Sequence, residues 1–395
     1  MSRISNDPGS EIETLVREIE PRLIELRRDI HAHPETGFDT IRTAGIVADE
    51  LRAMGLEPRT GIGRTGVVAE IAGGRPGPCL ILRADMDALP IHEETGLPFA
   101  STVPGKMHAC GHDLHTSALL GAASALAQMA PQLAGTVRLV FQPAEETVDS
   151  GAAAMVADGA AEGADMAIAF HNQPDLPAGQ ILLYRGASTA SADEFHVVVH
   201  GKSGHAARPH ASRDPIVAAA YLITQLQTVI SREMDPDLSA VLTVGKIEGG
   251  STNNIIPDSC MFLGTVRCRS PQSRDQAEAA LRRICAGTAA ALDMRIDVEY
   301  VRGAPPLMND DQMIDRTAQA LGAQFDGRVA VEQGKGFGAE DFSYFSERMP
   351  SAHIMVGSGQ PGRDDRLHNS DYQPDESCIA QSAVALTRMA VEFLS

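Results

Sequence analysis

Four short apolar runs without polar alternation most constrain the fold of this 395-residue chain. They are Gly66–Ile71, Pro78–Leu82, Val137–Phe141 and Met166–Phe170. Strands that are apolar on both faces are typical of a largely parallel sheet covered by helices on both sides. The segment His115–Met129 has the pattern of a helix that crosses between two such strands. We therefore expect an α/β fold with a central, largely parallel sheet flanked by helices.

The pattern changes after Gly186, where the predicted elements follow the order βαββαβ of a ferredoxin-like unit. These elements are Glu194–His200, Pro215–Arg232, Ala240–Ile247, Cys260–Cys268, Ser273–Leu292 and Arg295–Val301. The remaining stretch returns to apolar runs and closes with a predicted helix, Ser377–Leu394. We therefore predict one α/β domain formed by residues 1–186 and 304–395, with residues 187–303 inserted as a second domain.

The charge of the chain excludes several functions. A formal net charge of −19 argues against binding to nucleic acid and against docking on an anionic membrane surface.

No apolar run approaches the roughly 20 residues of a membrane-spanning helix, and Met1–Ser10 lacks the pattern of a secretory signal. The six cysteines have no paired spacing, as expected for reduced thiols in the cytoplasm.

Polar clusters follow the apolar runs. These clusters are Arg83–Pro90, Gln142–Glu146, His171–Pro174 and, after the apolar run His353–Val356, Leu367–Ser370. In open α/β sheets, ligands bind beyond the carboxyl ends of the strands. We therefore expect the four clusters to converge on one side of the sheet.

A fifth cluster, Met107–His115, lies just before the predicted helix, where backbone amides favour a deprotonated thiol. Cys110 and His112 are two residues apart, and in an extended stretch both side chains point at one ion. Together with Glu146, His171 and His368 they offer nitrogen, oxygen and sulfur donors. This mixture favours zinc, manganese, cobalt or nickel over calcium and magnesium.

Seven motifs resemble those of the aminoacylase, hippurate hydrolase and auxin-conjugate amidohydrolase family of two-metal peptidases. They are HAHPETGF (31–38), RADMDALP (83–90), HACGHDLHT (108–116), FQPAEE (141–146), GKSGHAARPH (201–210), TNNIIPD (252–258) and GAEDFSYF (338–345). They occur in order from about residue 20 to the C-terminus, and the CGHD motif with its companions is specific.

The resemblance implies a hydrolase that cleaves the amide bond of small N-acyl amino acids with two divalent metal ions per subunit. The implied ligands are Cys110, His112, Glu146, His171 and His368. Glu145 is implied as the general base, with Asp87 as its structural supporter. Asp85 is left out of the ligand set, because more distant carboxypeptidases have a metal-binding histidine at that position.

The inserted domain is implied to act as a lid and dimerisation domain. His205 is implied to act across subunits on the oxyanion, and Asn254 to contact substrate. The resemblance therefore implies a homodimer or homotetramer. Among residues outside this set, His31 is expected to shape a helix end, and Glu340 and Asp341 are expected to cap backbone amides.

Three alternatives remain open at the level of sequence. A dipeptidase or carboxypeptidase uses the same two-metal chemistry on a substrate with a free amine. A catalytically inactive homologue that binds a ligand is disfavoured, because Glu145 and all five proposed ligands are present. A thiol enzyme with Cys110 as its nucleophile is disfavoured, because the surrounding side chains are donors of the metal-binding type.

Overall fold

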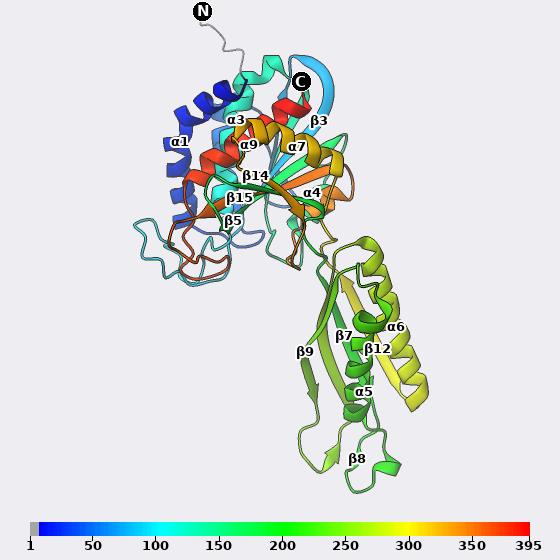
Figure 1. Cartoon of the computed structure of the whole chain (residues 1–395). Helices are drawn as coiled ribbons and strands as arrows, with labels where there is room; N and C mark the ends of the chain where they lie inside the picture. Colours follow the sequence, from blue (N-terminus) through cyan, green and yellow to red (C-terminus); the bar gives the residue numbers. More distant parts are fainter. Residues whose placement is uncertain (1–7) are drawn as a thin grey trace, which may run out of the picture. The chain divides into compact units, whose positions relative to one another are not determined.

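The computed structural model describes residues 8–395. Residues 1–7, part of the predicted first domain and of the stretch Met1–Ser10, lie outside the described residues. The chain forms two compact units (Figure 1). The first unit comprises Met1–Ser188, Met308–Gly334 and Asp341–Ser395, and the second comprises Thr189–Leu307 and Lys335–Glu340.

The first unit is built on one sheet. Its strands are β1 (Arg59–Ile62), β2 (Gly66–Ala72), β3 (Arg75–Asp85), β4 (Ala134–Gln142), β5 (Met166–Pro177), β6 (Ile181–Ala187), β13 (Met308–Asn309), β14 (Val329–Gln333) and β15 (Ser351–Gly359). Their order is β1-β2-β4-β3-β5-β15-β6-β13, with β14 beside β6. The central strands β4, β3, β5 and β15 are mutually parallel, whereas β2 and β6 run antiparallel to β4 and β15. The predicted largely parallel sheet is confirmed in its centre.

Helices cover this sheet. They are α1 (Pro8–Ala32), α2 (Ile41–Ala53), α3 (His112–Met129), α4 (Gly151–Ala157), α7 (Asp311–Gln324), α8 (Ser343–Ser346) and α9 (Ser377–Phe393). Helices α1, α3 and α9 pack against one another (Figure 1), and α3 and α9 both contact β3. Helix α3 is buried along almost its whole length because it has neighbours on all sides.

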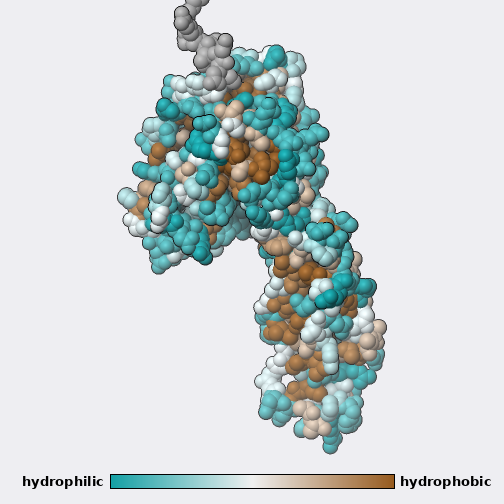
Figure 2. Space-filling model, in the orientation of Figure 1, coloured by the Kyte–Doolittle hydropathy of each residue, from teal (hydrophilic) through white to brown (hydrophobic). Residues whose placement is uncertain are grey.

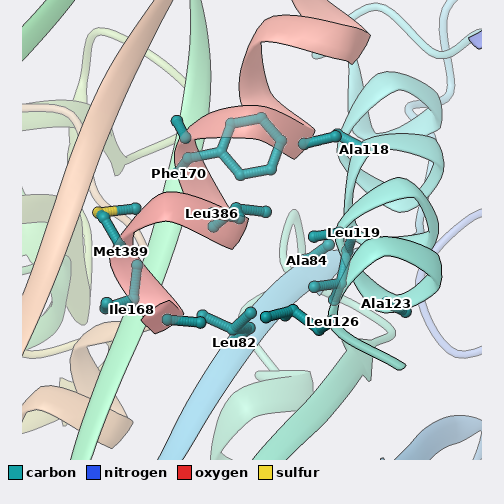
Figure 3. Close-up of a cluster of buried hydrophobic side chains, with 14 of the residues drawn as sticks. Leu82, Ala84, Ala118, Leu119, Ala123, Leu126, Ile168, Phe170, Leu386 and Met389 are labelled. Atoms are coloured by element: carbon teal, nitrogen blue, oxygen red, sulfur yellow. The ribbon is translucent and has the colours of Figure 1, made fainter. Parts of the chain in front are cut away.

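Aliphatic side chains fill the space between α3, α9 and the sheet, as Figure 3 shows. Leu82 and Ala84 of β3 and Ile168 and Phe170 of β5 lie in this core together with Leu119, Leu126, Leu386 and Met389. Burial of this apolar surface stabilises the unit by about 25 cal/mol per Å². It also holds the carboxyl ends of β3 and β5 in fixed positions beside the start of α3.

The second unit has the predicted βαββαβ order. Its main elements are β7 (Asp193–His200), α5 (Pro215–Thr228), β9 (Ala240–Gly249), β11 (Ser259–Cys268), α6 (Pro271–Leu292) and β12 (Arg295–Arg302). The sheet order β12-β7-β11-β9 is antiparallel throughout. Residues of α5 and α6 share a core with alternate residues of β7, such as Phe195 and Val197. A separate short pair joins β8 (Gly204–His205) to β10 (Ile255–Ile256).

The second unit also includes Lys335–Glu340, which the predicted boundaries assign to the other domain. Hydrogen bonds explain this difference, since Ala190 donates its amide to the Gly338 carbonyl and Arg269 donates to the Gly336 carbonyl. The assignment of residues 187–303 as a lid stays a prediction. None of the helices within residues 8–395 has the length and apolar character needed to cross a bilayer.

Candidate metal centre and catalytic site

The turn that carries Cys110 and His112 differs from the prediction. An extended stretch was expected up to a helix at His115, but α3 begins at His112. Gly111 precedes it with φ of 92°, in the left-handed region that glycine adopts most readily. A Cβ at Gly111 would overlap the side-chain amide of Asn172, so this position also lacks room for a side chain. The tight turn brings Cys110 and His112 to one place even though the chain is not extended.

The proposed ligands lie together at the carboxyl ends of the central strands. Cys110, His112 and His171 offer donor atoms within 4.8 Å of one another, and so do Cys110, Glu146 and His368. The Cys110 Sγ lies 3.4 Å from His171 Nε2, and His368 Nε2 lies 3.0 Å from a Glu146 carboxylate oxygen. His171 lies inside β5, which continues to Pro177 beyond the predicted strand end at Phe170. Cys110 belongs to both groups, as expected for two neighbouring cation positions.

His112 and Cys110 carry the clearest sign that a cation fits here. Among residues 8–395, neither ring nitrogen of the fully buried His112 has a hydrogen-bond partner, although buried polar groups normally do. Burial alone would lower the pKa of His112, but Asp85 and Asp87 raise it to about 10. Burial and the carboxylates of Glu146 and Glu145 raise the pKa of the Cys110 thiol well above its usual range. The predicted preference of the helix start for a thiolate stays a prediction. A bound cation would compensate the negative charge of the carboxylates and the thiolate in this donor set. Zinc-type cations fit such a mixture of nitrogen, oxygen and sulfur donors.

Asp87 holds the segment that carries Glu145 and Glu146. One carboxylate oxygen accepts the amide of Glu145 at 2.9 Å, and the other accepts the amide of Glu146 at 3.2 Å. The nearer oxygen lies 3.5 Å from His112 Nδ1, and a Glu145 oxygen lies 4.0 Å from His112 Nε2. Asp87 itself is buried. It therefore fixes two adjacent glutamates relative to the histidine that begins α3.

The backbone around these side chains is strained. Ala144, directly before Glu145, has φ of 53°, and His368 has φ of 65°. Non-glycine residues adopt the left-handed region at a cost, and such residues are common at functional sites. The amide of His368 donates to the Ala109 carbonyl, which ties the His368 loop to the Cys110 turn.

Asp85 binds two buried side chains next to the proposed ligands. Its carboxylate accepts hydrogen bonds from Arg83 and from His115 Nδ1, both at 2.6 Å. The other nitrogen of His115 accepts the amide of Asn172, next to His171. Burial would raise the pKa of Asp85, but the positive charges of His112 and Arg83 and the hydrogen bond from His115 hold it well below its usual range. Asp85 is therefore a buried carboxylate that orients side chains around the proposed ligands.

His205 and Asn254 lie in the second unit. The amide of Ala206 donates to the Asn254 carbonyl, and His205 pairs with Ile255 across β8 and β10. Both residues are exposed. The structure thus brings these two predicted residues side by side within the second unit.

Sequence reasoning missed several buried polar residues around the site. Asp341, expected only to cap amides, caps Ala152 and also accepts hydrogen bonds from Arg83 and Gln142. His31 does more than end its helix, because it bonds Asp113 and Glu93 at 2.8 and 3.2 Å. Their position within quoted motifs was the available signal, since neither burial nor long-range pairing is visible in a sequence.

Comparisons with known proteins identify the family. The model of peptidase family M20/M25/M40 matches residues 81–392. The chain is 39% identical over 394 residues to N-acetyl-L-cysteine deacetylase of Bacillus subtilis, which covers 98% of this chain and 93% of that protein. It is 37% identical over 372 residues to hippurate hydrolase of Campylobacter jejuni, with 93% and 96% covered.

Two further similarities bear on the chemistry. Over 383 residues the chain is 35% identical to thermostable carboxypeptidase 1 of Saccharolobus solfataricus, with 96% of this chain and 97% of that protein covered. A solved structure of a dinuclear metal-binding peptidase of the M20 family from Bacillus subtilis superposes with a TM-score of 0.85 at 34% identity, covering 96% of this chain and 99% of that chain.

Proposed function

Because the chain belongs to peptidase family M20/M25/M40 and is a hydrolase of amide bonds, we propose that its substrates are N-acyl amino acids, such as N-acetyl or N-benzoyl conjugates. The observation that carries the catalytic part of this proposal is the Asp87 carboxylate bound to the amides of both Glu145 and Glu146. That arrangement supports the proposal because it fixes the orientation of two adjacent residues, the proposed general base and a proposed metal ligand. The deacetylase and the hippurate hydrolase among its relatives support the substrate class.

Five side chains would hold two divalent cations of the zinc, manganese, cobalt or nickel type. They are Cys110, His112, Glu146, His171 and His368. Bound cations would polarise the scissile carbonyl and lower the pKa of a water molecule toward neutrality. The two donor groups that share Cys110 support a two-cation arrangement.

Glu145 is the proposed general base. Its carboxylate accepts the proton of the attacking water and then delivers a proton to the leaving nitrogen. Asp87 keeps this carboxylate in place through the backbone, because the amide that it binds belongs to Glu145 itself. His205 is proposed to donate a hydrogen bond to the oxyanion, and Asn254 to bind substrate, both from the lid.

We also propose that the protein is a homodimer or homotetramer. Figure 2 shows hydrophobic surface on the second unit, where the exposed large apolar side chains include Ile216, Val217, Tyr221, Ile247 and Ile255. Three of these lie on α5, and Ile247 lies on the edge strand β9. Exposed apolar surface and an unpaired strand edge are features of interfaces. A cytoplasmic location is proposed as well, because all six cysteines are free.

A second candidate is a dipeptidase or carboxypeptidase. It is supported by the similarity to the carboxypeptidase of Saccharolobus solfataricus, and it requires an acidic partner for the free amine of the substrate.

Release of free amino acid from a panel of N-acetyl and N-benzoyl amino acids and dipeptides tests the proposal. The wild type is compared with Glu145→Gln and with the surface control Glu25→Gln. Turnover of acyl amino acids that E145Q loses and E25Q keeps is expected. Turnover of dipeptides alone would favour the second candidate, and no turnover of any substrate would contradict both.

A further inference from the structure

The motif GAEDFSYF contains a buried carboxylate that the proposed reaction does not use directly. Asp341 lies just before α8 and is almost completely buried. One of its oxygens accepts hydrogen bonds from Arg83 at 2.9 Å and from the Gln142 amide at 2.7 Å. The other accepts the Ser150 hydroxyl at 2.6 Å and the amide of Ala152 at 3.1 Å. Such charge-assisted bonds are stronger than neutral ones.

These donors stand at the two ends of the glutamate loop, which we define as residues 143–149. Gln142 is the last residue of β4, and Ser150 is the N-cap of α4. The glutamate loop joins them and carries Glu145 and Glu146. Asp341 therefore connects the two ends of this loop through a single carboxylate, although it is about two hundred residues distant in sequence.

The same carboxylate is linked to the floor of the site through Arg83. The buried guanidinium donates to Asp341, to Gln142 and to Asp85. Asp85 in turn lies 3.7 Å from His112 Nδ1. A continuous set of hydrogen bonds thus connects the ends of the glutamate loop to Asp85, whose carboxylate lies near His112 without a hydrogen bond to it.

The loop needs such support because its backbone is strained. Ala144 adopts φ of 53°, and Gly151 packs so closely that a Cβ there would overlap the Pro143 carbonyl. Strained conformations persist only where the surroundings fix them. Asp87 binds the middle of the loop through the amides of Glu145 and Glu146, whereas Asp341 binds its ends.

We propose that Asp341 is a positioning residue that holds the glutamate loop in its strained conformation, and thereby sets the orientation of Glu145 and the metal affinity of Glu146. This inference deepens the proposed function and rests on it for the roles of these two glutamates. Removal of partners that orient a ligand typically weakens metal affinity by about 10-fold to 100-fold.

The test uses Asp341→Asn, which keeps the shape but removes the charge. Asp193→Asn is the matched control, because Asp193 is also buried and paired with an arginine, Arg274, but lies in the second unit. Hydrogen exchange across residues 143–152 is measured in the metal-free full-length protein. Zinc alone is then titrated, and kcat and KM are measured for the best N-acyl substrate.

For D341N we expect faster exchange in the glutamate loop, zinc binding weaker by about 10-fold to 100-fold, and a fall in kcat with little change in KM. D193N should change none of these. Wild-type exchange and zinc affinity in D341N would overturn the inference. If the wild type hydrolyses no acyl substrate, the proposed function fails, yet exchange and zinc binding still decide the role of Asp341.

Should D341N fail to fold, Ser150→Ala provides the second test, since it removes one donor to Asp341 and leaves the carboxylate in place. It should increase exchange of the glutamate loop in the same direction, and unchanged exchange would overturn the inference.

Discussion

The carboxylate of Asp87 accepts a hydrogen bond from the backbone amide of Glu145 at 2.9 Å. The proposed base is therefore oriented through its own main chain, by a residue two positions beyond the end of β3. Together with the bond to the amide of Glu146, this bond keeps the partly buried Glu145 and Glu146 close to His112.

Replacement of Asp87 tests this relationship. Asp87→Asn removes the charge and leaves one amide of the glutamate segment without an equivalent acceptor. We expect kcat/KM for an N-acyl amino acid to fall by about 10-fold to 100-fold, with the protein still folded. Asp29→Asn, at an exposed surface ion pair with Arg42, is the control. Full activity in D87N would show that the orientation of Glu145 does not depend on this carboxylate.

The turn at Gly111 gives a prediction about stability. Gly111 and Gly105 both have positive φ, but only Gly111 lacks room for a Cβ. Gly105→Ala should cost about 1–2 kcal/mol through backbone strain alone. Gly111→Ala should cost about 1–3 kcal/mol more, because the new methyl group overlaps Asn172. Urea unfolding of both variants measures the difference, and equal losses would refute the steric account of this turn.

His31 makes the stability of the metal-free protein depend on pH. Burial alone would lower its pKa, but Asp113 and Glu93 outweigh burial and the nearby Arg27 and raise it. A histidine with a raised folded pKa contributes stability that is complete below its unfolded pKa of about 6.5 and is lost as the pH rises through the folded pKa.

We therefore expect the free energy of unfolding of the wild type to exceed that of His31→Gln at pH 5.5, and the difference to shrink toward pH 9. Urea unfolding at several pH values measures it. His33→Gln, whose side chain is partly exposed, is the control for substitution within this helix end. A difference that grows with pH would contradict the assigned ion pair.

Replacement of Cys110 distinguishes its proposed role as a metal ligand from the alternative role of a nucleophile. If it is a ligand, Cys110→Ser should weaken zinc binding by at least about 10-fold and lose turnover that excess metal partly restores. Cys79→Ser, at a cysteine away from the donor groups, should change neither property. Abolished turnover with wild-type metal content in C110S would instead support the nucleophile alternative.

Much of this fold was predictable because buried segments have a recognisable pattern of apolar residues in the sequence. The continuous apolar runs at Pro78–Leu82 and Met166–Phe170 predicted the parallel strands β3 and β5. The order βαββαβ of the elements after Gly186 predicted the second unit. The antiparallel direction of β2 was not distinguished, because a strand between two neighbours is apolar whatever the direction of those neighbours. Strand β6 was not predicted.

The site was predictable to the extent that its chemistry depends on residue type. The types and positions of the donor side chains indicated the proposed ligand set, but the sequence did not indicate the residues that hold those side chains in place. Asp341 meets Arg83 only because the fold closes across more than half of the chain. The start of α3 at His112 was missed for a local reason: Gly111 adopts a left-handed turn where an extended segment was assumed.

Metal removal and restoration test the central claim most directly. The purified protein is assayed for release of amino acid from the N-acyl panel, then treated with a chelator, and then supplied separately with zinc, manganese, cobalt or nickel. The account predicts turnover that disappears on chelation and returns with at least one of these metals. Turnover that persists in protein shown to contain no metal would contradict it.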